Sequence, residues 1–347
     1  MFSQVLSSAP GPALGDHLRR EGAAHPALTP ELAALLVELA GAGRLVAREA
    51  ARAPLTGRLG DTGAINVQGE RVKKLDEWAN RTLVETLRES RLVSVLVSEE
   101  LEEPLLVPEC QGPSRYVVCL DPVDGSLNAD VNGVVGTIFG VRPGLPAAGP
   151  DPGAAALGPG TAQVAAGYVM YGPATVLVYT AGHGVHGLTL DPASGEFVLT
   201  HPAIRMPAEG TTYAVNEANR RHWPPAARDC VETLKGGGVT GRPYSLRYVG
   251  ALVADFHRIL LEGGVYLYPA EPLRRPTGRL RLLYEAAPLA LVAEQAGGRA
   301  STGTARVLEV AATAFHQRVP LLIGSPREVA LAEACYRGEA AQPSRDA

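Results

Sequence analysis

The chain has 347 residues, of which 46% are hydrophobic, and a formal net charge of −4. This length predicts two domains or one large one, with ample apolar material for a core. The charge balance lacks the basic footprint of a nucleic-acid-binding protein, and the apolar runs fall short of the roughly 20 residues that span a membrane.

The N-terminus shows no positive region followed by an apolar block, so we expect no secretory signal. The four cysteines stand apart with no CxxC pair, which is typical of reduced structural thiols. They are Cys110, Cys119, Cys230 and Cys335. We therefore expect a cytoplasmic protein that binds neither membranes nor nucleic acid.

Leucines at helical spacing predict a helix over 29–51, with Thr29 as its N-cap and Pro30 in its first turn. A short helix is expected before it, near 14–21. Residues 53–72 are rich in glycine, so we expect a long loop there that acts as a lid. A further helix is expected over 74–89.

Apolar runs bounded by turn residues predict the strands that follow. The expected strands cover 92–97, 116–121, 134–141, 164–171, 174–180, 187–190, 197–200, 212–215, 266–269 and 321–324. Later helices are expected over 249–262, over 284–295 and up to about residue 335, and a surface loop over 143–161.

A change of pattern near 201–212 predicts a domain boundary. We expect an N-terminal domain over 1–205 that carries the metal site and the lid, a C-terminal domain over 206–338 and a disordered tail over 339–347. Strands that alternate with helices indicate an α/β or α+β fold of packed layers.

One predicted strand runs directly into a cluster of polar groups. It is followed by Asp121, Asp124, Gly125 and Ser126 within six positions. Carboxylates suit a hard cation such as Mg²⁺, and backbone N–H groups of the Gly and Ser suit a phosphate. The alternatives are a turn with solvated acids and a calcium loop, although the calcium-loop pattern needs acids at alternate positions, which this stretch lacks.

A second acid pair, Glu99 and Glu100, ends the preceding predicted strand. Carboxyl ends of neighbouring strands meet at one sheet edge, so the two pairs predict one metal site. Such a cluster can clamp the attacking water and the leaving oxygen of a phosphoryl transfer. Because Glu102 and Glu103 follow, a solvated acidic face is the other interpretation of this pair alone.

Two of the chain's three lysines, Lys73 and Lys74, stand beside Asp76. They either begin a solvated helix or lie at the edge of the metal cluster, where Asp76 holds or deprotonates a water. A basic stretch over 274–281 is either a solvated surface or a phosphate site, since Arg binds two oxygens with its fork. Glu285 behind it offers one more carboxylate.

With these residues in place, the chain resembles the class I fructose-1,6-bisphosphatases from about residue 32 to 335. The matching strings are 66–70 (NVQGE), 72–76 (VKKLD), 97–100 (VSEE), 116–126 (YVVCLDPVDGS), 135–140 (VGTIFG), 247–250 (RYVG), 266–270 (YLYPA) and 280–285 (LRLLYE). The Asp-Pro-x-Asp-Gly-Ser string alone is shared by the wider metal-dependent, lithium-sensitive phosphatases, including inositol phosphatases.

The resemblance implies a layered α/β/α/β/α sandwich of two subdomains, the sugar-phosphatase fold. It implies two to three Mg²⁺ ions per subunit, with Mn²⁺ or Zn²⁺ as substitutes. The implied metal ligands are Glu99, Glu100, Asp121, the Val123 carbonyl, Asp124 and Glu285. Asp76 and Glu100, beside Glu99, match the carboxylates that activate the attacking water.

The resemblance also implies a sugar-bisphosphate site. Asp124, Gly125 and Ser126 match the groups at the 1-phosphate, and Asn216, Tyr248, Leu252, Tyr268 and Arg279 match those at the sugar and the 6-phosphate. Arg247 matches an arginine that reaches the neighbouring subunit's site in a homotetramer. The loop around 56–72 matches a mobile lid.

This chain departs from the family at two substrate positions and at the AMP site. Asn219 stands where the family usually has Tyr, and Arg279 where it usually has Lys. Pro30 lacks an N–H that the family uses to bind AMP, and Ala33 replaces a Thr, although Arg115 and Tyr116 match a Lys-Tyr pair. We therefore expect weak or absent AMP inhibition.

The expected function is Mg²⁺-dependent hydrolysis of fructose 1,6-bisphosphate to fructose 6-phosphate, a step of gluconeogenesis. Sedoheptulose-1,7-bisphosphatase activity, alone or alongside, is one alternative. An inositol phosphatase and a non-catalytic sugar-phosphate or metal-binding regulator are the others.

Overall fold

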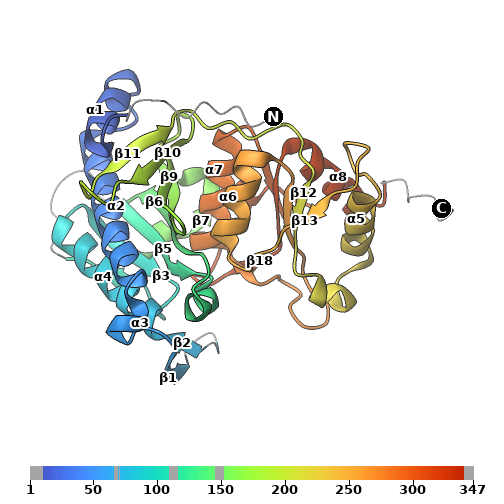
Figure 1. Cartoon of the computed structure of the whole chain (residues 1–347), viewed down its shortest axis with the longest axis horizontal. Coiled ribbons are helices and arrows are strands. Elements are labelled where there is room, and N and C mark those ends of the chain that lie inside the picture. Colours follow the sequence, from blue (N-terminus) through green and yellow to red (C-terminus); the bar gives the residue numbers. More distant parts are fainter. Residues whose placement is uncertain (1–10, 66–68, 70, 109–115, 145–151, 340–347) are drawn as a thin grey trace.

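Two large β-sheets alternate with three layers of helices (Figure 1). The computed structural model describes residues 11–65, 69, 71–108, 116–144 and 152–339. The five layers confirm the α/β/α/β/α sandwich expected from the sequence. Cys110, Arg115, residues 66–68, 70 and 145–151 and the tail 340–347 lie outside the described residues.

The helices are α1 (Leu14–Ala24), α2 (Pro30–Ala50), α3 (Ala53–Thr56), α4 (Lys74–Ser90), α5 (Pro225–Lys235), α6 (Leu252–Glu262), α7 (Ala287–Gln295) and α8 (Pro326–Arg337). The strands are β1 (Asp61–Ile65), β2 (Arg71–Lys73), β3 (Val93–Ser98), β4 (Leu105–Leu106), β5 (Tyr116–Asp124), β6 (Val135–Pro143), β7 (Gly158–Pro159), β8 (Ala165–Tyr171), β9 (Thr175–Thr180), β10 (His186–Leu190), β11 (Phe197–His201), β12 (Thr212–Ala214), β13 (Ser245–Leu246), β14 (Val265–Tyr268), β15 (Leu280–Arg281), β16 (Arg299–Ser301), β17 (Ala311–Ala312), β18 (Arg318–Val319) and β19 (Leu321–Gly324). Short 3₁₀ helices are η1 (Ser126–Val131), η2 (Pro152–Ala156), η3 (Gly160–Ala162), η4 (Glu217–His222) and η6 (Val307–Glu309), and η5 (Leu282–Ala286) is a π-helical turn.

The larger sheet has eight strands in the order β11-β10-β9-β8-β6-β5-β3-β4. Of the neighbouring strand pairs in this sheet, only β3–β5 is parallel, and every other pair is antiparallel. Helices α1, α2 and α4 bury their leucines against one face of this sheet. The predicted start of α2 is confirmed, because the Thr29 hydroxyl accepts the N–H of Leu32 and Pro30 opens the helix.

The smaller sheet has five strands in the order β13-β12-β14-β19-β16. Helices α6 and α7 lie between the two sheets, and one continuous core joins them to both. Helices α5 and α8 cover the outer face of the smaller sheet. Among the described residues, no helix is both long and apolar enough to cross a membrane.

Several sequence-based boundaries were wrong. The segment 53–72 is not a plain loop, since it contains the short helix α3 and the hairpin β1–β2. Its strands are mostly exposed and lack apolar alternation, so no period-2 signal reveals them. The stretch 143–161 likewise carries η2, β7 and η3 in its described part.

Helix α5 was missed entirely. It begins at Pro225 after another proline, and its buried side chains (Ala227, Cys230, Val231 and Leu234) are too few and small to stand out among charged neighbours. The helix expected over 249–262 begins only at Leu252. The helix expected over 284–295 is preceded by the π-helical turn that carries Glu285.

Candidate active site

A β-bulge sets the position of the two aspartates. The strand expected to end at Asp121 continues to Asp124, and Asp121 pairs with Ile138 while Asp124 pairs with Gly136. The step of three residues from Asp121 to Asp124 therefore lies opposite a step of only two residues in β6, from Ile138 to Gly136. Residues three apart in a regular strand point to opposite faces, so the extra residue lets both carboxylates share one side. The Thr137 hydroxyl donates to the Pro122 carbonyl within the bulge, at 2.7 Å.

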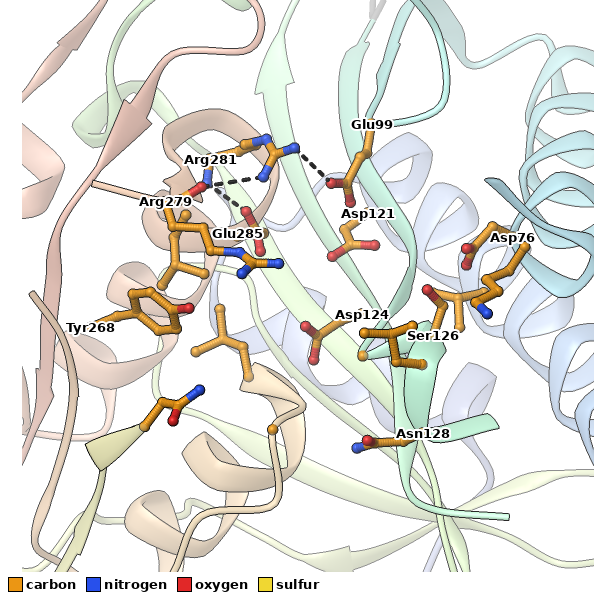
Figure 2. A pocket seen from close by; sticks show the side chains of 18 of the residues that line it. Asp76, Glu99, Asp121, Asp124, Ser126, Asn128, Tyr268, Arg279, Arg281 and Glu285 are labelled. Carbon is orange, nitrogen blue, oxygen red and sulfur yellow. Dashed lines mark hydrogen bonds and ion pairs between the residues drawn. The ribbon is translucent and has the colours of Figure 1, made fainter. Parts of the chain in front are cut away.

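Three buried carboxylates meet beside this bulge. Oxygens of Asp121, Asp124 and Glu285 all lie within 4.8 Å of one another, and these residues are 2%, 8% and 6% exposed. Asp121 and Asp124 come from β5, whereas Glu285 comes from the π-helical turn η5, a type of turn that often occurs at functional sites. Figure 2 shows the three side chains converging, with Glu99 facing them.

Repulsion and burial make this cluster costly without a cation. Burial, followed by repulsion from Glu99 and its neighbours, raises the pKa of Asp121 well above its usual value. The pKa of Asp124 is raised to about 7 mainly by burial, although the N–H groups at the start of α6 lower it. The pKa of Glu285 is raised to about 8 by burial and by Glu99. A bound divalent cation would relieve this repulsion.

Asp76 lies in the first turn of α4, at the edge of the cluster. It is 6% exposed, and its Oδ1 has no hydrogen-bond partner among the described residues. Burial and the Glu100 charge raise its pKa well above the usual value, and a hydrogen bond with Ser126 opposes this. Asp76 also lines the active-site cavity, and a buried carboxylate oxygen without a partner suits a water or a cation.

Gly125 joins β5 to η1 in the left-handed backbone conformation, which glycine adopts readily. Its φ is 74°, and a Cβ there would lie 2.4 Å from the Cβ of Ala251. This close approach brings the start of α6 to the aspartates, where Asp124 Oδ2 accepts the N–H of Val253 at 2.7 Å. Gly125 and Ser126 thereby line the pocket directly beside the carboxylates.

The carboxylates lie at one end of a cavity of about 720 Å³. Nearly all predicted site residues line it: Asp76, Glu99, Glu100, Asp121, Val123, Asp124, Gly125, Ser126, Asn216, Tyr248, Leu252, Tyr268, Arg279 and Glu285. In Figure 2, Tyr268 and Arg279 lie across the pocket from Asp76 and Ser126. The exceptions are Arg247, which is exposed and does not line the cavity, and Asn219, which does not line it either.

Lys73 lines the same cavity as Asp76, as one of the two interpretations predicted, and it also has a role that neither predicted. Its buried ammonium pairs with Asp61 at 2.7 Å and Asp130 at 2.8 Å, and the Gly60 N–H also donates to Asp130. These bonds fasten the β1–β2 hairpin to η1, the turn that follows Gly125. Lys74, by contrast, is exposed at the start of α4.

Arg281 was missed as a site residue. It is 3% exposed, its guanidinium lies 3.4 Å from Glu99, and its backbone N–H donates to Glu285 (Figure 2). It therefore balances part of the negative charge and orients one carboxylate. In the sequence Arg281 is one member of a basic run that could be a solvated surface. The only sign that it belongs to the metal site is its position four residues before Glu285.

The donor set fits a hard divalent cation. All its side-chain ligand atoms are carboxylate oxygens, with no histidine or cysteine in the described cluster, and hard cations such as Mg²⁺ and Mn²⁺ prefer oxygen. The cluster could hold such an ion.

Comparisons with known proteins agree with this arrangement. The family model described as "Fructose-1-6-bisphosphatase, N-terminal domain" matches residues 16–202, and the corresponding C-terminal domain model matches residues 206–337. A class 1 fructose-1,6-bisphosphatase of Oleidesulfovibrio alaskensis is 47% identical over 328 residues, covering 93% of this chain and 97% of that protein. One of Thermosynechococcus vestitus is 46% identical, covering 95% and 94%.

A solved structure shares the fold. The crystal structure of Leishmania major fructose-1,6-bisphosphatase in holo form superimposes with a TM-score of 0.87 at 38% identity, covering 95% of this chain and 99% of that one. Both family models and the relatives span nearly the whole chain. The chain therefore belongs to the fructose-1,6-bisphosphatase family, a metal-dependent family of phosphatases.

Proposed function

We propose that this chain hydrolyses the 1-phosphate of fructose 1,6-bisphosphate, yielding fructose 6-phosphate and phosphate, with Mg²⁺ as cofactor. The observation that carries the proposal is a cavity with two ends of opposite character. Buried carboxylates line one end, and Arg279 lines the other. Its volume of about 720 Å³ lies within the range of small-molecule sites.

The acidic end is the proposed reaction centre. Two to three Mg²⁺ ions would be held by Glu99, Glu100, Asp121, the Val123 carbonyl, Asp124 and Glu285. When bound, the cations supply Lewis-acid polarisation of the phosphoryl oxygens. Arg281 limits the net negative charge of the cluster by its contact with Glu99.

Asp76 is the proposed general base, with Glu100 beside it. The raised pKa of the Asp76 carboxyl gives it a strong affinity for the proton of the attacking water. The N–H groups of Gly125 and Ser126 donate to the transferring phosphoryl group, where negative charge is spread over the oxygens. An Asp76→Asn variant should lose roughly 100- to 10,000-fold in kcat, the usual contribution of a general base.

The opposite end positions the second phosphate. Arg279 can hold two of its oxygens, while Tyr268, Tyr248 and Asn216 offer hydroxyl and amide groups and Leu252 packs beside the sugar. Binding energy at this remote group fixes the reacting phosphate in line with the attacking water. Truncated substrates should therefore lose rate as well as affinity.

The same proposal extends to the assembly. A homotetramer in which Arg247 reaches a neighbouring subunit's site is consistent with an exposed Arg247 that lies outside its own chain's cavity. We further propose a division into domains 1–205 and 206–338 and a cytoplasmic location, which the unpaired thiols of the described cysteines support.

A phosphate-release assay in Mg²⁺ tests the activity. Asp121→Asn should abolish release, whereas Asp191→Asn, in an exposed turn far from the cluster, should leave it unchanged. A fully active Asp121→Asn variant would contradict the metal site. Absence of release from every sugar bisphosphate tested would instead favour a non-catalytic regulator.

A second substrate is supported by two residues. Arg279 lines the remote end where the family usually has Lys, and Asn219, where the family usually has Tyr, does not line it, so this end has room to accept sedoheptulose 1,7-bisphosphate. The test compares kcat/KM for both bisphosphates and for inositol 1-phosphate, with Arg279→Lys as the matched variant. A preference that does not move in that variant would exclude Arg279 as its cause.

A further inference from the structure

A second group of potential metal ligands lies outside the active site. His17 and Glu21 are one helical turn apart on α1, so they share one face, and His186 approaches them from β10. One ligand atom from each of these three residues lies within 4.8 Å of the other two. His25, the C-cap of α1, and His183 stand beside them, so four of the chain's eight histidines gather here.

The geometry leaves buried polar atoms without partners. His17 is 4% exposed, yet its Nε2 has no hydrogen-bond partner among the described residues, and the same is true of the Tyr179 hydroxyl nearby. A polar atom buried without a partner is costly, so such an atom in a native fold needs an explanation. A bound cation would give the His17 nitrogen its missing partner.

Glu21 is the centre of the group. Its Oε2 lies 3.7 Å from His186 Nε2 and 3.9 Å from His25 Nε2. In a tetrahedral zinc site, neighbouring ligand atoms are about 3.4 Å apart, which follows from metal–ligand bonds of about 2.0–2.2 Å. Glu21 therefore needs to close on His186 and His25 by roughly 0.5 Å or less, and the atoms of the three-residue group by at most about 1.4 Å. A cavity of about 10 Å³, the space of one water or ion, opens beside Glu21, His25 and His186.

The protonation of the histidines suits ligation. Burial, helped by the neighbouring His186, lowers the pKa of His17 to about 4, and burial also lowers that of His186. Neutral imidazole is the form that binds a metal. Of the surrounding charges, Glu21 favours a cation and Arg20 opposes one. The Ala203 N–H lies 3.4 Å from His186 Nδ1, a weak contact that gives way when the ring binds a metal through Nε2 and carries its proton on Nδ1.

We propose that His17, Glu21 and His186 form a second metal centre, for Zn²⁺ or a similar divalent transition ion, with His25 available as a fourth ligand. Imidazole and carboxylate ligands in this number are typical of zinc and unlike the all-carboxylate active site. The ion would link α1 to the β10–β11 edge of the large sheet, two elements that lie together in Figure 1. No residue of this centre lines the active-site cavity.

Metal analysis of the full chain tests the proposal. An Asp121→Asn background weakens the carboxylate site, and excess Mg²⁺ occupies what remains of it, since hard cations compete poorly for imidazole. After incubation with Zn²⁺ and gel filtration, this variant should keep one zinc per chain. Adding His17→Asn and His186→Asn should remove it. Adding His222→Asn, a matched change on η4, should not.

Co²⁺ provides a spectroscopic check on the ligands. Bound to this centre it should give the intense visible bands of a tetrahedral site with nitrogen ligands, and these bands should vanish in the double histidine variant. Circular dichroism verifies that each variant is folded. The proposal is overturned if the Asp121→Asn variant retains no zinc, or if the folded double histidine variant retains as much as its parent.

Discussion

Binding of a divalent cation to the active-site carboxylates should release protons. In the metal-free protein, burial and repulsion hold the pKa of Asp124 at about 7 and that of Glu285 at about 8. At pH 7 the first group carries about half a proton and the second about 0.9, so the cation displaces about 1.4 protons from these two. At pH 9 they hold only about 0.1. Proton release from these two groups should therefore fall by about 1.3 per chain between pH 7 and pH 9.

The same raised pKa values predict how the affinity for Mg²⁺ depends on pH. Protons and cation compete for the same oxygens, so Mg²⁺ should bind more weakly as the pH falls below about 8. Calorimetric titration of Mg²⁺ into chelator-treated protein, repeated in buffers of different ionisation enthalpy, gives the number of protons released. Glu285→Gln should remove at least about 0.9 of them at pH 7, because the loss of its charge also lowers the pKa of the neighbouring Asp121, and Asp191→Asn should remove none. Equal proton release at pH 7 and pH 9 would mean that Asp124 and Glu285 are already ionised at pH 7 in the metal-free protein.

Four further outcomes are expected. The raised carboxyl pKa values stabilise the metal-free protein at low pH and lose this effect as the pH rises through 7 and 8, so its melting temperature should fall from pH 6 to pH 9 in a thermal scan. Gly125→Ala should lower the free energy of unfolding in urea by about 2–5 kcal/mol, because the added Cβ clashes with Ala251 and the positive φ strains an alanine. The control Gly182→Ala has open space around it and should lower this free energy only by the strain of its positive φ, about 1–2 kcal/mol. Lys73→Met should speed hydrogen exchange in the β1–β2 hairpin by roughly tenfold or more, because it removes the ion pairs with Asp61 and Asp130. Unchanged exchange would mean that other contacts hold the hairpin. AMP titration should show weak or no inhibition, and inhibition at micromolar AMP would contradict the assignment of the altered site.

Much of the site could be predicted because its residues come in unbroken strings. The carboxylates that follow β3 and those at the end of β5 stand at the ends of apolar runs, and two parallel neighbouring strands must bring their ends to one edge. Glu285 and Arg279 lie far along the chain, and only the family resemblance linked them to that edge. Composition alone left Glu285 as one carboxylate behind a basic run.

The parts that the sequence did not predict depend on tertiary contacts. The β1–β2 hairpin has exposed strands with no apolar alternation and is fixed by the ion pairs of Lys73, which no local pattern encodes. Arg281 looked like a surface arginine because its pairing with Glu99 joins residues far apart in the chain. Helix α5 was hidden by its opening prolines and short apolar face.

The bulge in β5 has a consequence for how this sequence can change. The distance in residues between Asp121 and Asp124 determines which face each carboxylate occupies, so chain length there matters more than the identity of Pro122 or Val123. Deleting one of those two residues would restore an uninterrupted ladder with β6 while turning one aspartate away from the cavity. In this stretch, regular pairing of β5 with β6 would prevent Asp121 and Asp124 from both facing the cavity. A library of single-residue deletions should therefore yield folded, inactive proteins at these positions.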